Sequence, residues 1–283
     1  MSPLEPIRQR IVAHVRGVFN DPAKGEAPTP PSDDAWFEKD SPIRLVHADV
    51  VGMLVGGVRG LLLQMLHPHA LQGVLDFSDF RSDMHGRLKR TARFIAVTTF
   101  AHRDEAQAAI DRVNRIHANV AGTLPDGTPY EATDPRTLAW VHVVEAQSFL
   151  AGYMRYVDPQ MTLAAQDEYF DQFALIAGKL GADPLPRTRA EADRIFAELR
   201  SDLSTSPKAR EVARLVLSQR PEGTPRALQK MLATEAVSIL PAFARRLLHL
   251  DTPQWNALPA RIGTQATAST LRWAFRQGYR TPA

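Results

Sequence analysis

The chain has 283 residues, of which 44% are hydrophobic and 23% are charged, and its formal net charge is +3. This balance is typical of a globular protein with a core and does not favour disorder. The absence of cysteine excludes disulfides, thiolate nucleophiles, cysteine-bound zinc, iron–sulfur clusters and cysteinate-bound haem. The 34 basic residues are spread along the chain, so nothing favours nucleic acid as a partner.

Residues 1–40 are predicted to form a helix followed by a proline-rich arm. Apolar residues recur at helical spacing between 3 and 19, and a stretch rich in proline and glycine follows from 21 to 34. The start has no apolar core of signal-peptide length, so we expect a cytoplasmic protein. Residues 41–283 are predicted to form a single helical domain with one continuous core.

A long apolar helix is predicted from Pro42 to about Leu66. Ser41 is typical of an N-cap that precedes proline at the first helical position, and Pro68 ends the helix. Arg59 interrupts its most hydrophobic part, which therefore falls short of the roughly 18 charge-free residues of a membrane span. We expect a buried helix and no transmembrane segment.

Four glycines lie in this apolar stretch, at positions 52, 56, 57 and 60. A helix position without a side chain lets another backbone or a flat ligand come close. The pattern allows both explanations, and packing against another helix is the more common one.

The polar segment from Asp76 to His85 is predicted to be a loop that lines a site, because many of its side chains can bond their own backbone. Helices are predicted from Gly86 to about Ala101 and from Asp104 to Val120. Gly122 is the expected stop of the second helix.

One β-hairpin is predicted near residues 123–130, because Asp126-Gly127 is a strong signal for a tight turn. Further helices are predicted to begin at Asp134-Pro135, after the capping box that starts at Thr188, and at Ser206-Pro207. Pro241 should split the helical stretch from 228 to 250, and a last helix is expected near 268–276. The predicted fold class is therefore all-α, with one multi-helix domain and one short hairpin.

His117 is the histidine with the strongest reason to be buried, because it shares the apolar face of its helix with Val113, Ile116 and Val120. A buried imidazole needs a partner for each ring nitrogen, and a metal can be one of them. A histidine that is hydrogen-bonded within the core is the more common explanation on position alone.

Arg87, Arg90 and Thr91 lie on neighbouring turns of one helix face, because residues three and four apart are adjacent there. Such a cluster suits an anion or bound oxygen. The alternative is a solvated basic face, which Arg93 also favours.

His142 and Glu145 have the three-residue spacing of di-iron bundles, but in reversed order and without a second Glu-x-x-His pair. His67 and His69 can bind a metal, although residues at such a position more often cap helix carbonyls. Glycine-rich phosphate loops and a Gly-x-Ser-x-Gly elbow are missing, so nucleotide and hydrolase functions lack their motifs.

Several segments together resemble the mpaB and rubber oxygenase (latex clearing protein) family. The resemblance is carried by Arg59-Gly-Leu-Leu-Leu-Gln-Met-Leu-His-Pro68, Ser78-Asp-Phe80, Gly86-Arg-Leu-Lys-Arg-Thr91, Val113-Asn-Arg-Ile-His117, Gly122 through Asp-Gly to Tyr130, Asp134-Pro through Trp140-Val-His142, and Asp167-Glu-Tyr169. It covers nearly the whole chain and is most specific from 59 to 170. The family resemblance implies an all-helical protein that holds haem b and oxidises apolar, often isoprenoid, substrates with dioxygen.

The resemblance also implies roles for individual residues. His117 matches the proximal haem iron ligand, and Arg87 and Thr91 match the pair on the distal side, where Arg87 or Arg90 would act on dioxygen or on haem propionates. Arg90 departs from the lysine of rubber-cleaving members, and a guanidinium does not readily ligate a metal. This departure argues against a lysine-closed state and against rubber as the substrate.

The expected function is that of a haem b-dependent oxygenase acting with dioxygen on an apolar, isoprenoid-like small molecule. The alternative is a haem-binding sensor or carrier without oxygenase turnover, and a third is a cofactor-free helical scaffold. The family's glutamate base has no secure match, although Asp76, Asp79 or Asp83 can stand in for it. The sequence leaves the substrate, the reductant and the oligomeric state open.

Overall fold

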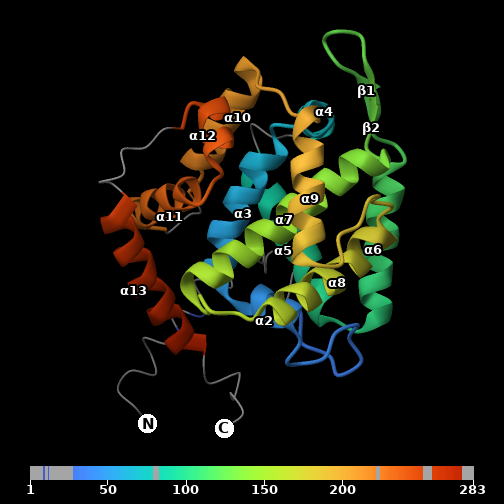
Figure 1. Ribbon diagram of the computed structural model, residues 1–283. Coiled ribbons are helices and arrows are strands. Elements are labelled where there is room, and N and C mark those ends of the chain that lie inside the picture. The colour runs from blue at the N-terminus through green and yellow to red at the C-terminus, as the bar shows by residue number, and fades with distance from the viewer. Residues whose placement is uncertain are drawn as a thin grey trace.

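The computed structural model describes Gln9, Val12 and residues 28–78, 83–220, 224–250 and 257–275. The described residues form α2 (Pro42–Ala48), α3 (Val50–Gln64), α4 (Pro68–Phe77), α5 (Met84–Phe100), α6 (Arg103–His117), β1 (Ala121–Thr123), β2 (Pro129–Glu131), α7 (Pro135–Tyr156), α8 (Leu163–Lys179), α9 (Arg189–Glu198), the 3-10 helix η2 (Leu199–Asp202), α10 (Pro207–Ser218), α11 (Arg226–Ser238), α12 (Ala242–Leu248) and α13 (Ala257–Phe275). The prediction of an all-α fold with one β-hairpin is therefore confirmed (Figure 1). The helix predicted between 3 and 19 lies largely outside the described residues, and the domain boundary after residue 40 stays a prediction.

The apolar stretch after Pro42 forms two helices rather than the single helix that we predicted. α2 and α3 meet at Asp49 with a bend of 90°. Asp49 has an extended backbone, and its carboxylate accepts a hydrogen bond of 2.7 Å from the backbone N–H of Gly52. This N-cap begins a new helix, and the apolar pattern, which resumes directly after Asp49, could not show the break.

Within the described ranges, no single helix is both long and apolar enough to cross a membrane, and only the bent pair of α2 and α3 meets those criteria jointly.

The centre of the fold is the contact between α3 and α7, which cross in the middle of Figure 1. A Cβ atom added at Gly56 would lie 2.5 Å from the carbonyl oxygen of Ser148, and one added at Gly52 would lie 3.2 Å from the backbone nitrogen of Tyr153. Gly152 faces the backbone of Gly52 from the other helix. Of the two explanations for the glycines, the structure selects close packing of helix on helix.

Two large apolar clusters flank the α3–α7 contact. One combines residues such as Leu62 and Trp140 with α9, α10 and α12, and the other combines Phe149 and Tyr169 with α2, α6 and α8. Ile110 of α6 is fully buried in the second cluster. The α5–α6 helix pair is thereby fixed to the core through its middle.

The segment from Asp76 to His85 is shorter as a loop than predicted. α4 extends to Phe77 and α5 already begins at Met84, so the helices take residues from both ends of the expected loop. The predicted helix stop at Gly122 is wrong, because α6 ends at His117 and Gly122 pairs with Tyr130 in the β-hairpin. The Tyr130 hydroxyl donates a hydrogen bond of 2.6 Å to Asp76, which holds the hairpin against α4.

The helix starts predicted from capping residues are confirmed. Asp134, Thr188 and Ser206 each accept a hydrogen bond from a backbone N–H of the helix that follows. Pro241 separates α11 from α12 as expected. The last helix, α13, begins at Ala257 and is therefore longer than predicted.

Candidate functional site

The antiparallel pair of α5 and α6 brings Arg87 and His117 to the same end of the fold. The two helices are joined by a short turn after Phe100, so the first turn of α5 lies beside the last turn of α6. The proximity is also electrostatic, because the charge of Arg87 is one of the causes that lower the pKa of His117. Two residues that are 30 positions apart in the sequence thus belong to one site.

His117 is half-buried, and its Nδ1 atom is buried without a hydrogen-bond partner in the described structure. Burial, followed by the charges of His142 and Arg87, lowers the pKa of His117 below its ordinary value. The imidazole is therefore neutral at pH 7 and has a lone pair free for a ligand bond. The carbonyl or carboxylate partner that we expected for its second nitrogen is missing among the described residues.

α7 contributes a second imidazole and a carboxylate to this end of the fold. His142 is buried, and its Nδ1 atom lies 3.4 Å from a carboxylate oxygen of Glu145. Glu145 also acts electrostatically on Arg87 and on the buried Tyr169, where it adds to the effect of burial in raising the tyrosine pKa. Glu145 is thus a carboxylate whose charge acts on Arg87.

Sequence reasoning considered Glu145 only as part of a di-iron motif and did not assign it to this site. The available signal was its spacing of three residues from His142 on a helix that is otherwise buried along most of its length. Glu145 is half-buried, and its charge acts on Arg87 although the two form no ion pair in the described structure. Only the tertiary structure brings α7 and α5 close enough for this effect.

Arg87 differs from the other two residues of its cluster. It is half-buried, burial is the largest cause that lowers its pKa, and no hydrogen bond or ion pair holds its guanidinium within the described structure. Arg90 is exposed and forms an ion pair of 3.0 Å with Asp83, which also N-caps α5. Thr91 is exposed as well. The structure therefore places Arg87 near His117, and places Arg90 and Thr91 on the solvent side of α5.

The carboxylates considered as a base in place of the family's glutamate are partly engaged elsewhere. Asp76 accepts the hydrogen bond from Tyr130, and Asp83 is paired with Arg90. Asp79 lies outside the described residues. Glu145 is the carboxylate that the structure adds to these candidates.

The pair His67 and His69 lies at the start of α4, with ring centroids 5.4 Å apart. Burial lowers the pKa of His67 to about 4, so its imidazole is neutral. Within the described ranges, no three histidine or carboxylate side chains are arranged to hold a metal ion. A metal bound by these side chains alone, including the di-iron site, therefore has no support there.

Comparison with known protein families identifies the chain. A family model described as ER-bound oxygenase mpaB/B'/rubber oxygenase, catalytic domain, matches residues 44–273. The chain belongs to this family. Membership in the mpaB/rubber oxygenase family supports an oxygenase-type function and a small-molecule substrate. The matched range includes Arg87, His117, His142 and Glu145.

Searches of curated proteins and of solved structures gave no match to this chain.

Proposed function

We propose that this member of the mpaB/rubber oxygenase family is a haem b-dependent oxygenase that uses His117 as its iron ligand and acts with dioxygen on an apolar substrate. The observation that carries the proposal is the pairing of His117 with an arginine that has no partner of its own. A buried polar atom without a partner is uncommon in a folded protein, so the unpaired Nδ1 atom of His117 supports a place for a bound group.

The residues present fit haem. His117 is a neutral imidazole with an unpaired buried nitrogen, and one such ligand is sufficient because the porphyrin supplies four nitrogens of its own. The side chains around it do not assemble a separate metal site within the described structure. When bound, haem would supply the redox chemistry with dioxygen that the protein side chains lack.

Arg87 would stabilise negative charge that develops on dioxygen or would pair with a haem propionate. Its guanidinium stays protonated at neutral pH despite burial, and no carboxylate of the described structure forms an ion pair with it. Glu145 lies within electrostatic range and offsets part of its charge. The Arg87 guanidinium would therefore be available to bind an anionic group.

The visible absorption spectrum of protein expressed with a haem precursor tests this assignment. We expect a stoichiometric Soret band that shifts with dithionite and carbon monoxide and is lost or altered in His117→Ala. His142→Ala is the matched control, because it removes the neighbouring imidazole and should leave the band in place. A folded but colourless wild type, or a band unaffected by His117→Ala, contradicts the proposal.

Dioxygen consumption in the presence of a reductant and a polyprenyl compound separates an oxygenase from a haem-binding sensor or carrier. An oxygenase consumes dioxygen in proportion to the oxidised product. A sensor or carrier shows the same spectrum without product.

A further inference from the structure

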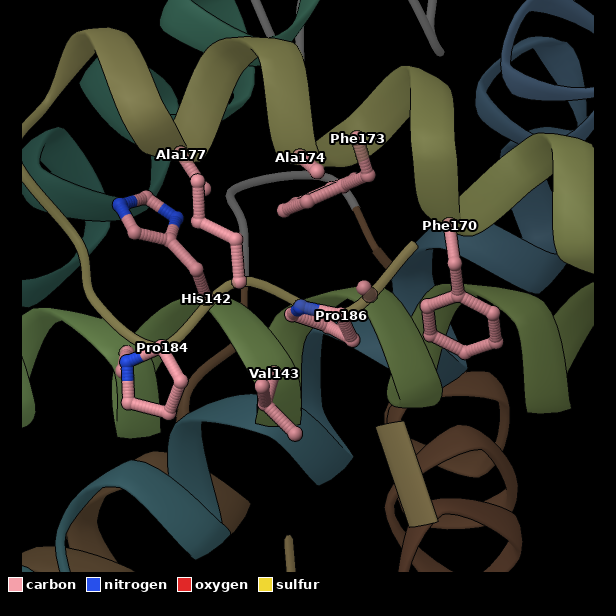
Figure 2. Close-up of a pocket in the computed structure, with 11 residues that line it drawn as sticks. His142, Val143, Phe170, Phe173, Ala174, Ala177, Pro184 and Pro186 are labelled. Atoms are coloured by element: carbon pink, nitrogen blue, oxygen red, sulfur yellow. The ribbon is translucent and has the colours of Figure 1, made fainter. Parts of the chain in front are cut away.

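A small cavity lies between α7 and α8, next to His142. Figure 2 shows the imidazole of His142 rising from α7 toward α8, with Pro184 and Pro186 across one side of the space. The cavity has a volume of about 10 Å³, counted as the space open to the centre of a water molecule. This is close to the room that a single small molecule needs.

The cavity exists because both helices present small side chains at their contact. Ala139 and Ala146 of α7 and Ala174 and Ala177 of α8 line it, and all four are buried. The chain after α8 closes it and is held in place by backbone hydrogen bonds, one of 3.1 Å from Asp183 to Pro135. The space is thus enclosed by ordered structure on several sides.

The lining makes the cavity unsuitable for water. Ten of its eleven lining residues are alanine, valine, leucine, phenylalanine or proline, and His142 is the exception. A buried water needs two to four polar partners, whereas apolar cavities stay dry and take up apolar ligands of matching size. A diatomic apolar gas meets both the size and the polarity of the space.

The position of His142 connects the cavity to the candidate site. Its ring forms part of the cavity wall, and its Nδ1 atom lies 3.4 Å from a carboxylate oxygen of Glu145. The same imidazole therefore belongs to the apolar cavity wall and to the histidine–glutamate pair of α7.

We propose that the cavity between α7 and α8 binds one molecule of dioxygen and supplies it to the site around His117. The binding itself depends only on the cavity. The supply role rests on the proposed oxygenase function.

Alanine methyl groups report directly on the binding. Because dioxygen is paramagnetic, it accelerates the relaxation of nearby methyl protons, which can be measured in alanine-methyl-labelled protein under dioxygen and under an equal pressure of nitrogen. We expect the largest effect at the four cavity alanines, Ala139, Ala146, Ala174 and Ala177. Ala192 and Ala213 are equally buried elsewhere and serve as internal controls. Equal relaxation at the cavity and control methyl groups overturns the proposal.

Variants of the lining change the binding in opposite directions. Ala174→Val should fill the space and abolish the effect at Ala177, whereas Ala164→Val, on an exposed position of the same helix, should leave it intact. If Ala174→Val does not fold, Val143→Ala enlarges the cavity and should strengthen the effect. An unchanged response in the folded lining variants contradicts the binding claim.

The rate at which dioxygen reoxidises the reduced, haem-loaded protein tests the supply role. We expect Ala174→Val to slow this rate several-fold and Ala164→Val to leave it unchanged. Dioxygen binding in the cavity together with an unchanged reoxidation rate overturns the supply role. A protein that binds dioxygen in the cavity but takes up no haem instead contradicts the proposed function.

Discussion

The buried Arg59 and the half-buried Arg87 differ in their hydrogen-bond partners. Arg59 of α3 donates hydrogen bonds to the Ser148 hydroxyl at 2.5 Å and to the Ile239 carbonyl at 3.0 Å, and burial lowers its pKa to about 10. Arg87 of α5 has no hydrogen bond or ion pair in the described structure. The Arg59 guanidinium thus joins α3 to α7 and to the C-terminal end of α11, whereas the Arg87 guanidinium has no partner in the described structure.

Two histidines repeat this contrast. His47 of α2 is fully enclosed, and its ring nitrogens face the Thr99 hydroxyl at 2.8 Å and the Tyr169 hydroxyl at 3.5 Å. The Nδ1 atom of His117 is buried with no partner in the described structure. His47 is therefore satisfied within the fold and His117 is not, although α7 also holds an unpaired buried nitrogen, the Nε1 atom of Trp140.

We expect this difference to distinguish residues that stabilise the fold from residues that bind a ligand. An unpaired buried group costs stability, and a functional role is one reason for a protein to keep it. Substitutions in the first region should therefore change the free energy of unfolding, and those in the second should change binding instead.

The largest expected effect is that of Gly56→Ala in the contact between α3 and α7. The new Cβ atom would lie 2.5 Å from the Ser148 carbonyl oxygen and 2.9 Å from the Phe149 Cα, and neither backbone atom can rotate away. We expect the free energy of unfolding to fall by roughly 3 kcal/mol or more. Urea denaturation followed by circular dichroism measures it.

Gly57→Ala is the matched control for this prediction. Its Cβ atom would meet only the Phe149 ring, at 3.8 Å, so the higher helix propensity of alanine should leave stability unchanged or raise it by up to about 1 kcal/mol. Equal destabilisation by the two variants would show that the close contact of the helices is not the cause.

Arg59→Met should come next in size. The substitution leaves the Ile239 carbonyl and the Ser148 hydroxyl without their donor, and we expect a loss of roughly 2 kcal/mol. The same denaturation assay measures it. A neutral result would mean that these acceptors find other donors.

Stability should also depend on pH through His47. Burial lowers its pKa in the folded protein to about 3, whereas an unfolded histidine titrates near 6.5, so the unfolded state binds more protons between these values. The neutral His47 ring therefore contributes most to the free energy of unfolding above pH 6.5. This contribution decreases as the pH falls and is smaller by about 2 kcal/mol at about pH 4.5. Urea midpoints measured across this range should show a shallower slope in His47→Gln, and an identical slope would assign the effect to other groups.

The smallest effect on stability is expected for Arg87→Met, despite the burial of this residue. No partner loses a hydrogen bond, so the free energy of unfolding should change by no more than about 0.5 kcal/mol. The same variant should weaken the reaction of the haem-loaded protein with dioxygen, measured as the reoxidation rate. A large loss of stability would place Arg87 with Arg59 as a structural residue.

Local signals in the sequence predicted most of the fold. Proline at the first helical position and capping residues gave the starts of α2, α7, α9 and α10, and Asp126-Gly127 gave the hairpin. The break at Asp49 was missed because an aspartate within an apolar run resembles an ordinary polar interruption. Only the observed cap on Gly52 reveals its role.

The site was predictable only in part. The resemblance to the family singled out Arg87 and His117, and a short turn between two helices is sufficient to bring them together. Glu145 and His142 join them from α7, whose path depends on packing between residues far apart in the chain. The sequence cannot show such contacts without the tertiary structure.

The glycine contact between α3 and α7 also determines which wall of the site can adapt. Helices whose backbones touch cannot slide or separate without losing that contact, so His142 and Glu145 lie on a fixed wall. Arg87 and His117 lie on α5 and α6, which are fixed through side chains such as Ile110 in the middle of the pair. We therefore expect substitutions under the α5–α6 pair to change the spacing between the two walls more readily than substitutions elsewhere in the core.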